Sequence, residues 1–138
     1  MSVDARVLVA DDDPDLLDVV AGSLTQLGAD VTRAESGAEL IELLAEHGPF
    51  DLVVTDIAMP WMTGLRAMHA ARTVGVGTSV IVMTGLRDPE IRAQVRALGG
   101  NAVLLEKPFE LSDLESAASR LLAQRRPEPI GPAPNGSG

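Results

Sequence analysis

Five short apolar runs alternate with longer segments of helical periodicity, and this alternation constrains the fold more than any other feature of the sequence. Four of the runs are nearly continuous in apolar residues, which is typical of parallel strands buried on both faces. The run at 30–34 contains enough polar residues to be an edge strand. In chain order, the runs lie at residues 7–10, 30–34, 52–55, 80–83 and 102–105.

Capping residues indicate where the intervening helices begin. Asp13 and Asp88 each precede a proline that suits the first position of a helix. Ser36 and Ser112 are each followed three residues later by a glutamate, which is the spacing of a capping box. Residues 64–72 are a fifth, shorter helical candidate. We therefore predict a doubly wound α/β fold, a flavodoxin-like (βα)5 arrangement whose parallel strands have the order 2-1-3-4-5.

Composition and charge exclude several functional classes. The 138-residue chain has no cysteine, so disulfides and thiolate metal sites are impossible. No apolar run approaches the length of a membrane span, and no signal-like segment begins the chain. The net charge of −9 argues against direct binding of nucleic acid. We expect one cytoplasmic domain over residues 4–122, with no membrane or nucleic-acid partner, followed by a disordered Pro/Gly-rich tail or linker at 123–138.

Polar side chains lie at the ends of four of the five expected strands. Ligands of a doubly wound sheet bind beyond the carboxyl ends of the strands, where the strand order reverses. The first and third strands are neighbours at that point, so Asp11, Asp12 and Asp56 should converge there. Thr84 ends the fourth strand, and Lys107 follows the fifth. The sequence therefore predicts three carboxylates at one edge of the sheet, beside a hydroxyl and an ammonium.

This predicted cluster suits phosphoryl transfer assisted by a metal ion. Three carboxylates so close together raise one another's pKa unless a cation joins them. Mg²⁺ is such a cation, with Mn²⁺ as an alternative, because it binds one or two carboxylates together with phosphate oxygens. An aspartate can attack phosphorus and hold an acyl phosphate, while an ammonium and a hydroxyl neutralise the phosphoryl oxygens. We therefore predict that Asp56 accepts a phosphoryl group.

Each of these residues also has a simpler interpretation. The run Asp11, Asp12 and Asp13 is compatible with an acidic helix N-terminus, and Thr84 with an ordinary loop. Lys107 is the only lysine beside ten arginines, and a codon bias toward arginine accounts for that scarcity. The bias does not account for the position of the one lysine after the last strand, where a compact ammonium suits a phosphoryl oxygen. Chance placement of such residues at four of five strand ends is improbable.

The sequence resembles the response-regulator receiver domains of two-component signalling over roughly residues 4–122. The most specific match is DLVVTDIAMPWMTG at residues 51–64, which has the phosphoacceptor strand and the D-x-x-M-P-x-M-x-G signature of that family. The segments RVLVADDDP, VIVMTG and LLEKPF match its acid pair, hydroxyl and Lys-Pro dipeptide. The resemblance implies a signalling switch that catalyses its own phosphorylation and dephosphorylation but is not a turnover enzyme.

The resemblance also implies a role for each site residue. It makes Asp56 the phosphoacceptor, with Thr84 and Lys107 holding the phosphoryl oxygens. It assigns the metal to Asp12 directly, to Asp11 mainly through water, to Asp56, and to the backbone carbonyl of Ala58. The bond between Lys107 and Pro108 is expected to be cis, as is common in the family.

Partners and output follow from the same resemblance. The phosphodonor is expected to be a sensor histidine kinase or a phosphotransfer protein. The output face is expected to be the fourth helix, fifth strand and fifth helix, which contact a downstream effector or a second copy of the chain. The sequence departs from the family pattern at Leu104, where many receivers have an aromatic residue that moves with the switch.

Two other functions are compatible with parts of the sequence. A pseudo-receiver that serves only as a binding scaffold would normally lack one of the five key positions, and all five are filled here. A phosphohydrolase of the haloacid dehalogenase type has a D-x-D motif after a strand, as Asp11 to Asp13 do. That type would require Thr or Val where Asp15 stands, a later acidic motif and a cap domain.

Overall fold

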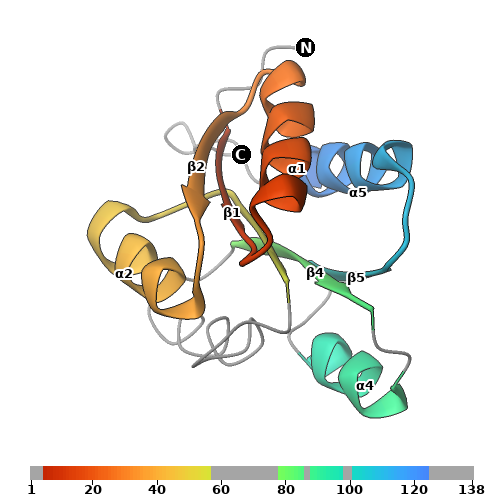
Figure 1. Cartoon of the computed structure of the whole chain (residues 1–138). Helices are drawn as coiled ribbons and strands as arrows, with labels where there is room; N and C mark the ends of the chain where they lie inside the picture. Colours follow the sequence, from red (N-terminus) through yellow and green to blue (C-terminus); the bar gives the residue numbers. More distant parts are fainter. Residues whose placement is uncertain (1–4, 57–77, 86–87, 98–100, 125–138) are drawn as a thin grey trace, which may run out of the picture.

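Five parallel strands form one sheet in the order β2-β1-β3-β4-β5, as the sequence predicts (Figure 1). The computed structural model describes residues 5–56, 78–85, 88–97 and 101–124. The elements, in chain order, are β1 (Arg6–Ala10), α1 (Pro14–Gln26), β2 (Asp30–Ala34), α2 (Gly37–His47), β3 (Leu52–Asp56), β4 (Ser79–Thr84), α4 (Pro89–Ala97), β5 (Ala102–Glu106) and α5 (Leu111–Gln124). The helix expected at 64–72 lies outside the described residues.

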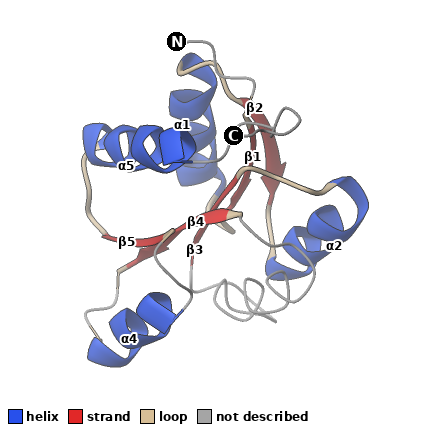
Figure 2. Ribbon diagram, turned by 180° about the vertical axis from the view of Figure 1, so that it is seen from behind, coloured by secondary structure: helices blue, strands red, loops and turns tan. Residues whose placement is uncertain are grey.

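The helices cover both faces of the sheet. α1 and α5 lie on one face, and α2 and α4 lie on the other (Figures 1 and 2). Alternate residues of β1 point to opposite faces. Val7 and Val9 join the core under α1 and α5, whereas Leu8 and Ala10 join the core under α2 and α4. This two-sided burial explains why the strands are apolar throughout rather than alternating.

The edge strands differ from the three central ones. Every residue of β3 and β4 is buried, and so is β1 beyond Arg6. β2 is partly exposed, as its polar sequence predicts. The prediction that β5 is buried on both faces was wrong, because all five of its residues are only half-buried. The reason is its position at the other edge of the sheet, where only β4 pairs with it.

Three of the four predicted helix starts are confirmed. The Asp13 carboxylate accepts the backbone N–H groups of Asp15 and Leu16, and the Ser36 hydroxyl accepts that of Glu39. The Asp88 carboxylate accepts the N–H of Glu90 at the start of α4.

The predicted cap at Ser112 was wrong. α5 begins at Leu111, and the Asp113 carboxylate accepts the backbone N–H of Glu110 at 3.2 Å. Asp113 lies three residues after Glu110, so its short side chain can reach back to that N–H group. At its other end α5 continues through Gln124, past the predicted domain boundary at 122.

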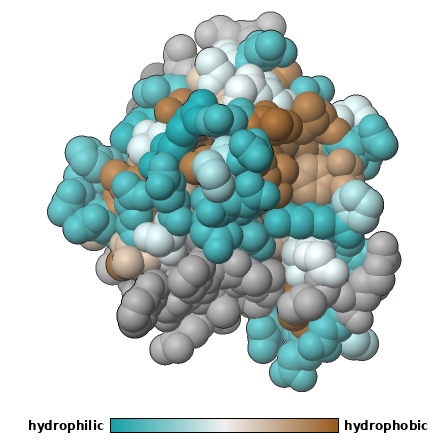
Figure 3. Space-filling model, in the orientation of Figure 1, coloured by the Kyte–Doolittle hydropathy of each residue, from teal (hydrophilic) through white to brown (hydrophobic). Residues whose placement is uncertain are grey.

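The surface seen in Figure 3 is mainly hydrophilic, and its hydrophobic part gathers in the region of α1 and α5. The exposed large hydrophobic side chains of the described residues are Val19 on α1 and Leu111 on α5. None of the helices in the described ranges has the length and apolar character needed to cross a membrane.

Candidate functional site

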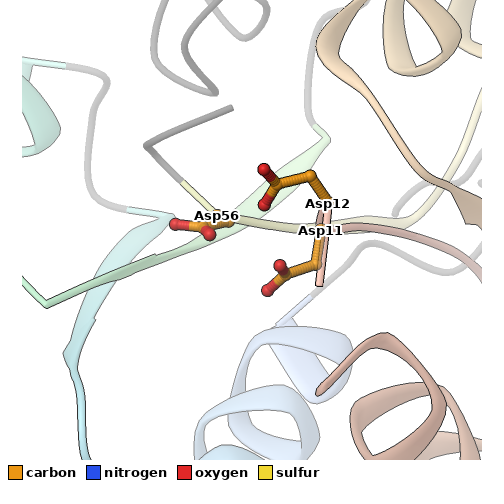
Figure 4. Close-up of side chains that lie close together, drawn as sticks. All are labelled: Asp11, Asp12 and Asp56. Atoms are coloured by element: carbon orange, nitrogen blue, oxygen red, sulfur yellow. The ribbon is translucent and has the colours of Figure 1, made fainter. Parts of the chain in front are cut away.

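The register of the sheet places the predicted acidic residues side by side. Ala10 at the end of β1 pairs with Thr55 of β3. The next residues along these two neighbouring strands are Asp11 and Asp56, so their side chains leave the sheet at the same edge (Figure 4). Asp12 follows Asp11 in the loop before α1. The expected convergence of the three carboxylates is therefore confirmed.

The three carboxylates form a compact cluster of oxygen ligands. One oxygen from each of Asp11, Asp12 and Asp56 lies within 4.8 Å of the other two. The Asp11 side chain is completely buried, Asp56 is 7 % exposed and Asp12 is exposed. Because the third carboxylate, Asp12, is exposed, a cation has a route from solvent to the two buried carboxylates.

Lys107 is the cation that the structure places against this cluster. Its Nζ lies 3.2 Å from Oδ2 of Asp56 and 3.8 Å from Oδ2 of Asp11. The peptide bond between Lys107 and Pro108 is cis, as the resemblance implied. Among the described residues, Lys107 is thus the one whose charged group contacts both buried carboxylates.

Thr84 lies next to these residues through the strand pairing. It follows Met83, which pairs with Asp56, and it pairs in turn with Glu106 of β5. Its backbone carbonyl accepts the N–H of Lys107 at 2.6 Å. Thr84 is completely buried. The ends of β3, β4 and β5 are therefore held in register, and Thr84 and Lys107 are fixed relative to Asp56.

Asp11 has the most unusual electrostatic environment of the site. Its Oδ1 accepts the backbone N–H of Asp13 at 2.9 Å, whereas its Oδ2 is buried without a hydrogen-bond partner. Burial raises the pKa of Asp11, and the neighbouring charges of Asp56 and Asp12 raise it further. The Asp13 N–H and the Lys107 ammonium act in the opposite direction but do not cancel the effect of burial.

This donor set fits a hard divalent cation. All three side chains offer carboxylate oxygens, which are the ligands that Mg²⁺ and Mn²⁺ prefer. Oδ2 of Asp11 is a buried acceptor with no hydrogen-bond donor, and its one positively charged neighbour among the described residues, the Lys107 ammonium, is 3.8 Å away. The fourth predicted ligand, the backbone carbonyl of Ala58, lies outside the described residues.

The sequence analysis missed one residue that positions the site. Asp13 was interpreted only as a helix cap, yet its backbone N–H also fixes the orientation of the Asp11 carboxylate. The spacing of two residues is that of an Asx-turn, in which an aspartate side chain bonds a backbone group two positions further on. That local signal was available in the Asp11 to Asp13 run.

Comparisons with known proteins agree on one family. The family model of the response regulator receiver domain matches residues 7–119. The response regulator receiver protein CpdR of Brucella abortus is 32% identical over 117 residues, which cover 85% of this chain and 96% of CpdR. The response regulator MprA of a Mycobacterium species is 34% identical over 131 residues, but these make up 56% of MprA. The chain thus spans about half the length of MprA.

The fold comparison gives the same result. The crystal structure of a CheY-like response regulator receiver domain protein from Methanospirillum hungatei superimposes with a TM-score of 0.82. The two proteins are 27% identical, and the match covers 89% of this chain and 97% of the other.

Proposed function

The chain belongs to the response regulator receiver domain family of two-component signalling, and from this membership we propose that Asp56 accepts a phosphoryl group from a sensor histidine kinase or a phosphotransfer protein. One observation carries the proposal. The buried Asp56 carboxylate lies within a cluster of three carboxylates and contacts the only lysine of the chain at 3.2 Å. A nucleophile, a metal site and a fixed ammonium are what transfer of a phosphoryl group to an aspartate requires.

The residues divide the chemistry between them. An Asp56 carboxylate oxygen attacks the phosphorus of a phosphohistidine, the P–N bond breaks, and the imidazole nitrogen leaves with the bonding pair. Lys107, already beside Asp56, balances the charge that the transferred group brings. Thr84 would donate its hydroxyl to a phosphoryl oxygen.

Asp11, Asp12 and Asp56, with the Ala58 carbonyl, would hold the metal ion. When bound, Mg²⁺ or Mn²⁺ supplies positive charge that offsets the negative charge on the phosphoryl oxygens. Asp13 contributes by holding the Asp11 carboxylate in place through its backbone N–H.

The proposed output is a change in the face formed by α4, β5 and α5. This face would contact a downstream effector or a second copy of the chain. Leu104 of β5, at the position where many receivers have an aromatic residue, is half-buried and packs against the core under α2 and α4. The switch proposed here therefore acts through Thr84 and Lys107 without an aromatic partner. A cytoplasmic location accords with these partners, and the domain is a signalling switch rather than a turnover enzyme.

A phosphorylation assay with matched variants tests the proposal. The protein is incubated with acetyl phosphate and Mg²⁺, and its intact mass is measured before and after alkali treatment. The wild-type chain should gain one alkali-labile phosphoryl group, and Asp56→Asn should gain none. Asp30→Asn is the control, because Asp30 is an exposed aspartate at the opposite end of the sheet. Labelling that persists in Asp56→Asn would contradict the proposal, because the acceptor would then be another residue. A wild-type chain that gains no phosphoryl group would favour the binding scaffold.

A further inference from the structure

An ion pair joins α4 to the end of β5, next to the proposed phosphorylation site. Nη2 of Arg92 on α4 lies 2.6 Å from Oε2 of Glu106, the last residue of β5. Glu106 lies between two residues of the site, because it directly precedes Lys107 and pairs with Thr84 across the sheet. The Glu106 side chain therefore extends from a strand end that adjoins both proposed phosphoryl-binding residues, Lys107 along the chain and Thr84 across the sheet.

The described contacts of α4 with the remainder of the domain are few. Ile91 and Val95 are its buried residues, and both join the core under α2 and α4. The helix lies beside β5 and apart from α1, α2 and α5 in both ribbon views (Figures 1 and 2). Arg92 provides a polar connection in addition to this small apolar contact. A change at Glu106 would therefore act directly on the position of α4.

We propose that the Arg92–Glu106 ion pair couples the position of α4 to the phosphorylation of Asp56. The inference rests on the proposed function and names the residues that would transmit its signal. A phosphoryl group on Asp56 would draw the Lys107 ammonium toward the added oxygens and away from its present contacts with the Asp11 and Asp56 carboxylates. It would also draw the Thr84 hydroxyl toward the new oxygens. Glu106 precedes Lys107 in the chain and pairs with Thr84 across the sheet, so its backbone would move with these two residues.

The direction of the coupling follows from the geometry of the pair. The contact is already as short as a charge-assisted hydrogen bond, at 2.6 Å, so movement of the Glu106 backbone with Lys107 and Thr84 would lengthen it. The pair therefore resists the phosphorylated arrangement. Removing the pair should therefore favour the phosphorylated arrangement, since coupling free energies act equally in both directions.

The expected size of the coupling is modest because the pair is partly exposed. The exposed fraction is 58% for the Arg92 side chain and 24% for the Glu106 side chain. Ion pairs of this kind contribute little in water, which corresponds to about a two- to fivefold change in a binding constant.

The affinity for a phosphoryl analogue measures the coupling at equilibrium. Beryllofluoride with Mg²⁺ is titrated into the wild-type chain, Arg92→Gln and Arg96→Gln. Arg96 is the control, because it lies one turn further along α4, is exposed, and makes no ion pair with any described residue. Arg92→Gln should bind the analogue about two- to fivefold more tightly than the wild type, and Arg96→Gln should bind it equally.

Two further measurements separate coupling from a general effect of the substitution. In a Glu106→Gln background, Arg92→Gln should change the affinity no further, because the partner is already absent. Amide hydrogen exchange over residues 89–97 should rise on analogue binding in the wild type. In Arg92→Gln it should be high before the analogue is added.

The outcomes distinguish this inference from the proposed function. If the wild type binds the analogue and is labelled by acetyl phosphate, but Arg92→Gln matches Arg96→Gln, the coupling is wrong and the proposed function stands. An equal effect of Arg92→Gln in both Glu106 backgrounds would also overturn the coupling. If the wild type neither binds the analogue nor accepts a phosphoryl group, both are wrong.

Discussion

At the scale of single residues, Asp11 is the described residue whose buried side chain is least completely hydrogen-bonded within the protein. Its Oδ2 is the one buried side-chain nitrogen or oxygen atom of the described residues without a hydrogen-bond partner. Lys107 Nζ is nearer to Asp56 than to Asp11, at 3.2 Å and 3.8 Å respectively. The ammonium alone therefore cannot compensate both carboxylates fully. The metal ion proposed for this site would supply the positive charge that the Asp11 carboxylate lacks.

The first prediction concerns the stability of the metal-free protein. Burial raises the pKa of Asp11 above its ordinary value of 3.8. The folded chain therefore keeps the Asp11 proton at pH values at which the unfolded chain has already released it. The stability associated with this proton is present below that value and is lost as the pH rises through the folded pKa. The Asp11→Asn variant removes this pH-dependent loss of stability, and its side-chain oxygen can still accept the Asp13 N–H.

Denaturant unfolding in EDTA should therefore show Asp11→Asn to be more stable than the wild type at pH 7, by about 1–3 kcal/mol. The difference should shrink as the pH is lowered toward 4. Asp30→Asn, which changes an exposed aspartate, should show no such trend. A variant that is less stable than the wild type at pH 7 without metal would contradict this account of Asp11.

At the scale of the elements, the start of α5 depends on a contact that the capping pattern did not indicate. Ser112 and Glu115 have the spacing of a capping box, but the structure uses Glu110 and Asp113. Glu115 instead accepts the hydroxyl of Ser23 on α1 at 2.6 Å, a contact between two helices on the same face of the sheet. This tertiary contact occupies the glutamate that the capping box would have used.

The second prediction compares the two candidate caps. Asp113→Ala removes the acceptor of the Glu110 N–H and a negative charge from the first turn of α5, and should lower the free energy of unfolding by about 0.5–1 kcal/mol. Ser112→Ala should change it by less, because Ser112 is exposed within the first turn and has no capping role. Urea denaturation of both variants provides the measurement. A larger loss in Ser112→Ala than in Asp113→Ala would restore the original capping prediction.

At the scale of the whole molecule, the strand order decides where the chemistry lies. β1 and β3 are adjacent in space although α1, β2 and α2 separate them in sequence. Their carboxyl ends bring two buried aspartates together, and β4 and β5 add Thr84 and Lys107 at the same edge of the sheet. Because the candidate site is assembled from four strand ends, its residues are positioned by four of the five strands of the sheet.

The third prediction follows from this shared assembly. An ion that binds only the folded chain stabilises all of it, by about 1.4 kcal/mol at ten times its dissociation constant. Thermal unfolding should therefore shift to higher temperature as Mg²⁺ is added, and the shift should saturate. Asp11→Asn should reduce it strongly, while Asp30→Asn should leave it unchanged. Equal shifts in wild type and Asp11→Asn would place the effect of Mg²⁺ outside this cluster.

The sequence by itself determined the fold class, the strand order and the convergence of three aspartates at one edge of the sheet. Continuous apolar runs indicate strands buried on both faces, and prolines and capping residues mark helix starts, because these preferences depend on residues close together in the chain. The convergence of Asp11, Asp12 and Asp56 followed from the strand order, since parallel strands end at one edge.

Only the tertiary structure decided the features that depend on neighbours far apart in the sequence. β5 is half-buried because it has one partner strand, although its residues are as apolar as those of a central strand. The cap of α5 depends on Asp113 while Glu115 bonds Ser23, and Arg92 pairs with Glu106. The Ser23–Glu115 and Arg92–Glu106 contacts each join two different elements across the fold, and local sequence does not encode such distances. The burial of Asp11 Oδ2 is likewise a property of the packed site, because it depends on neighbours from several elements.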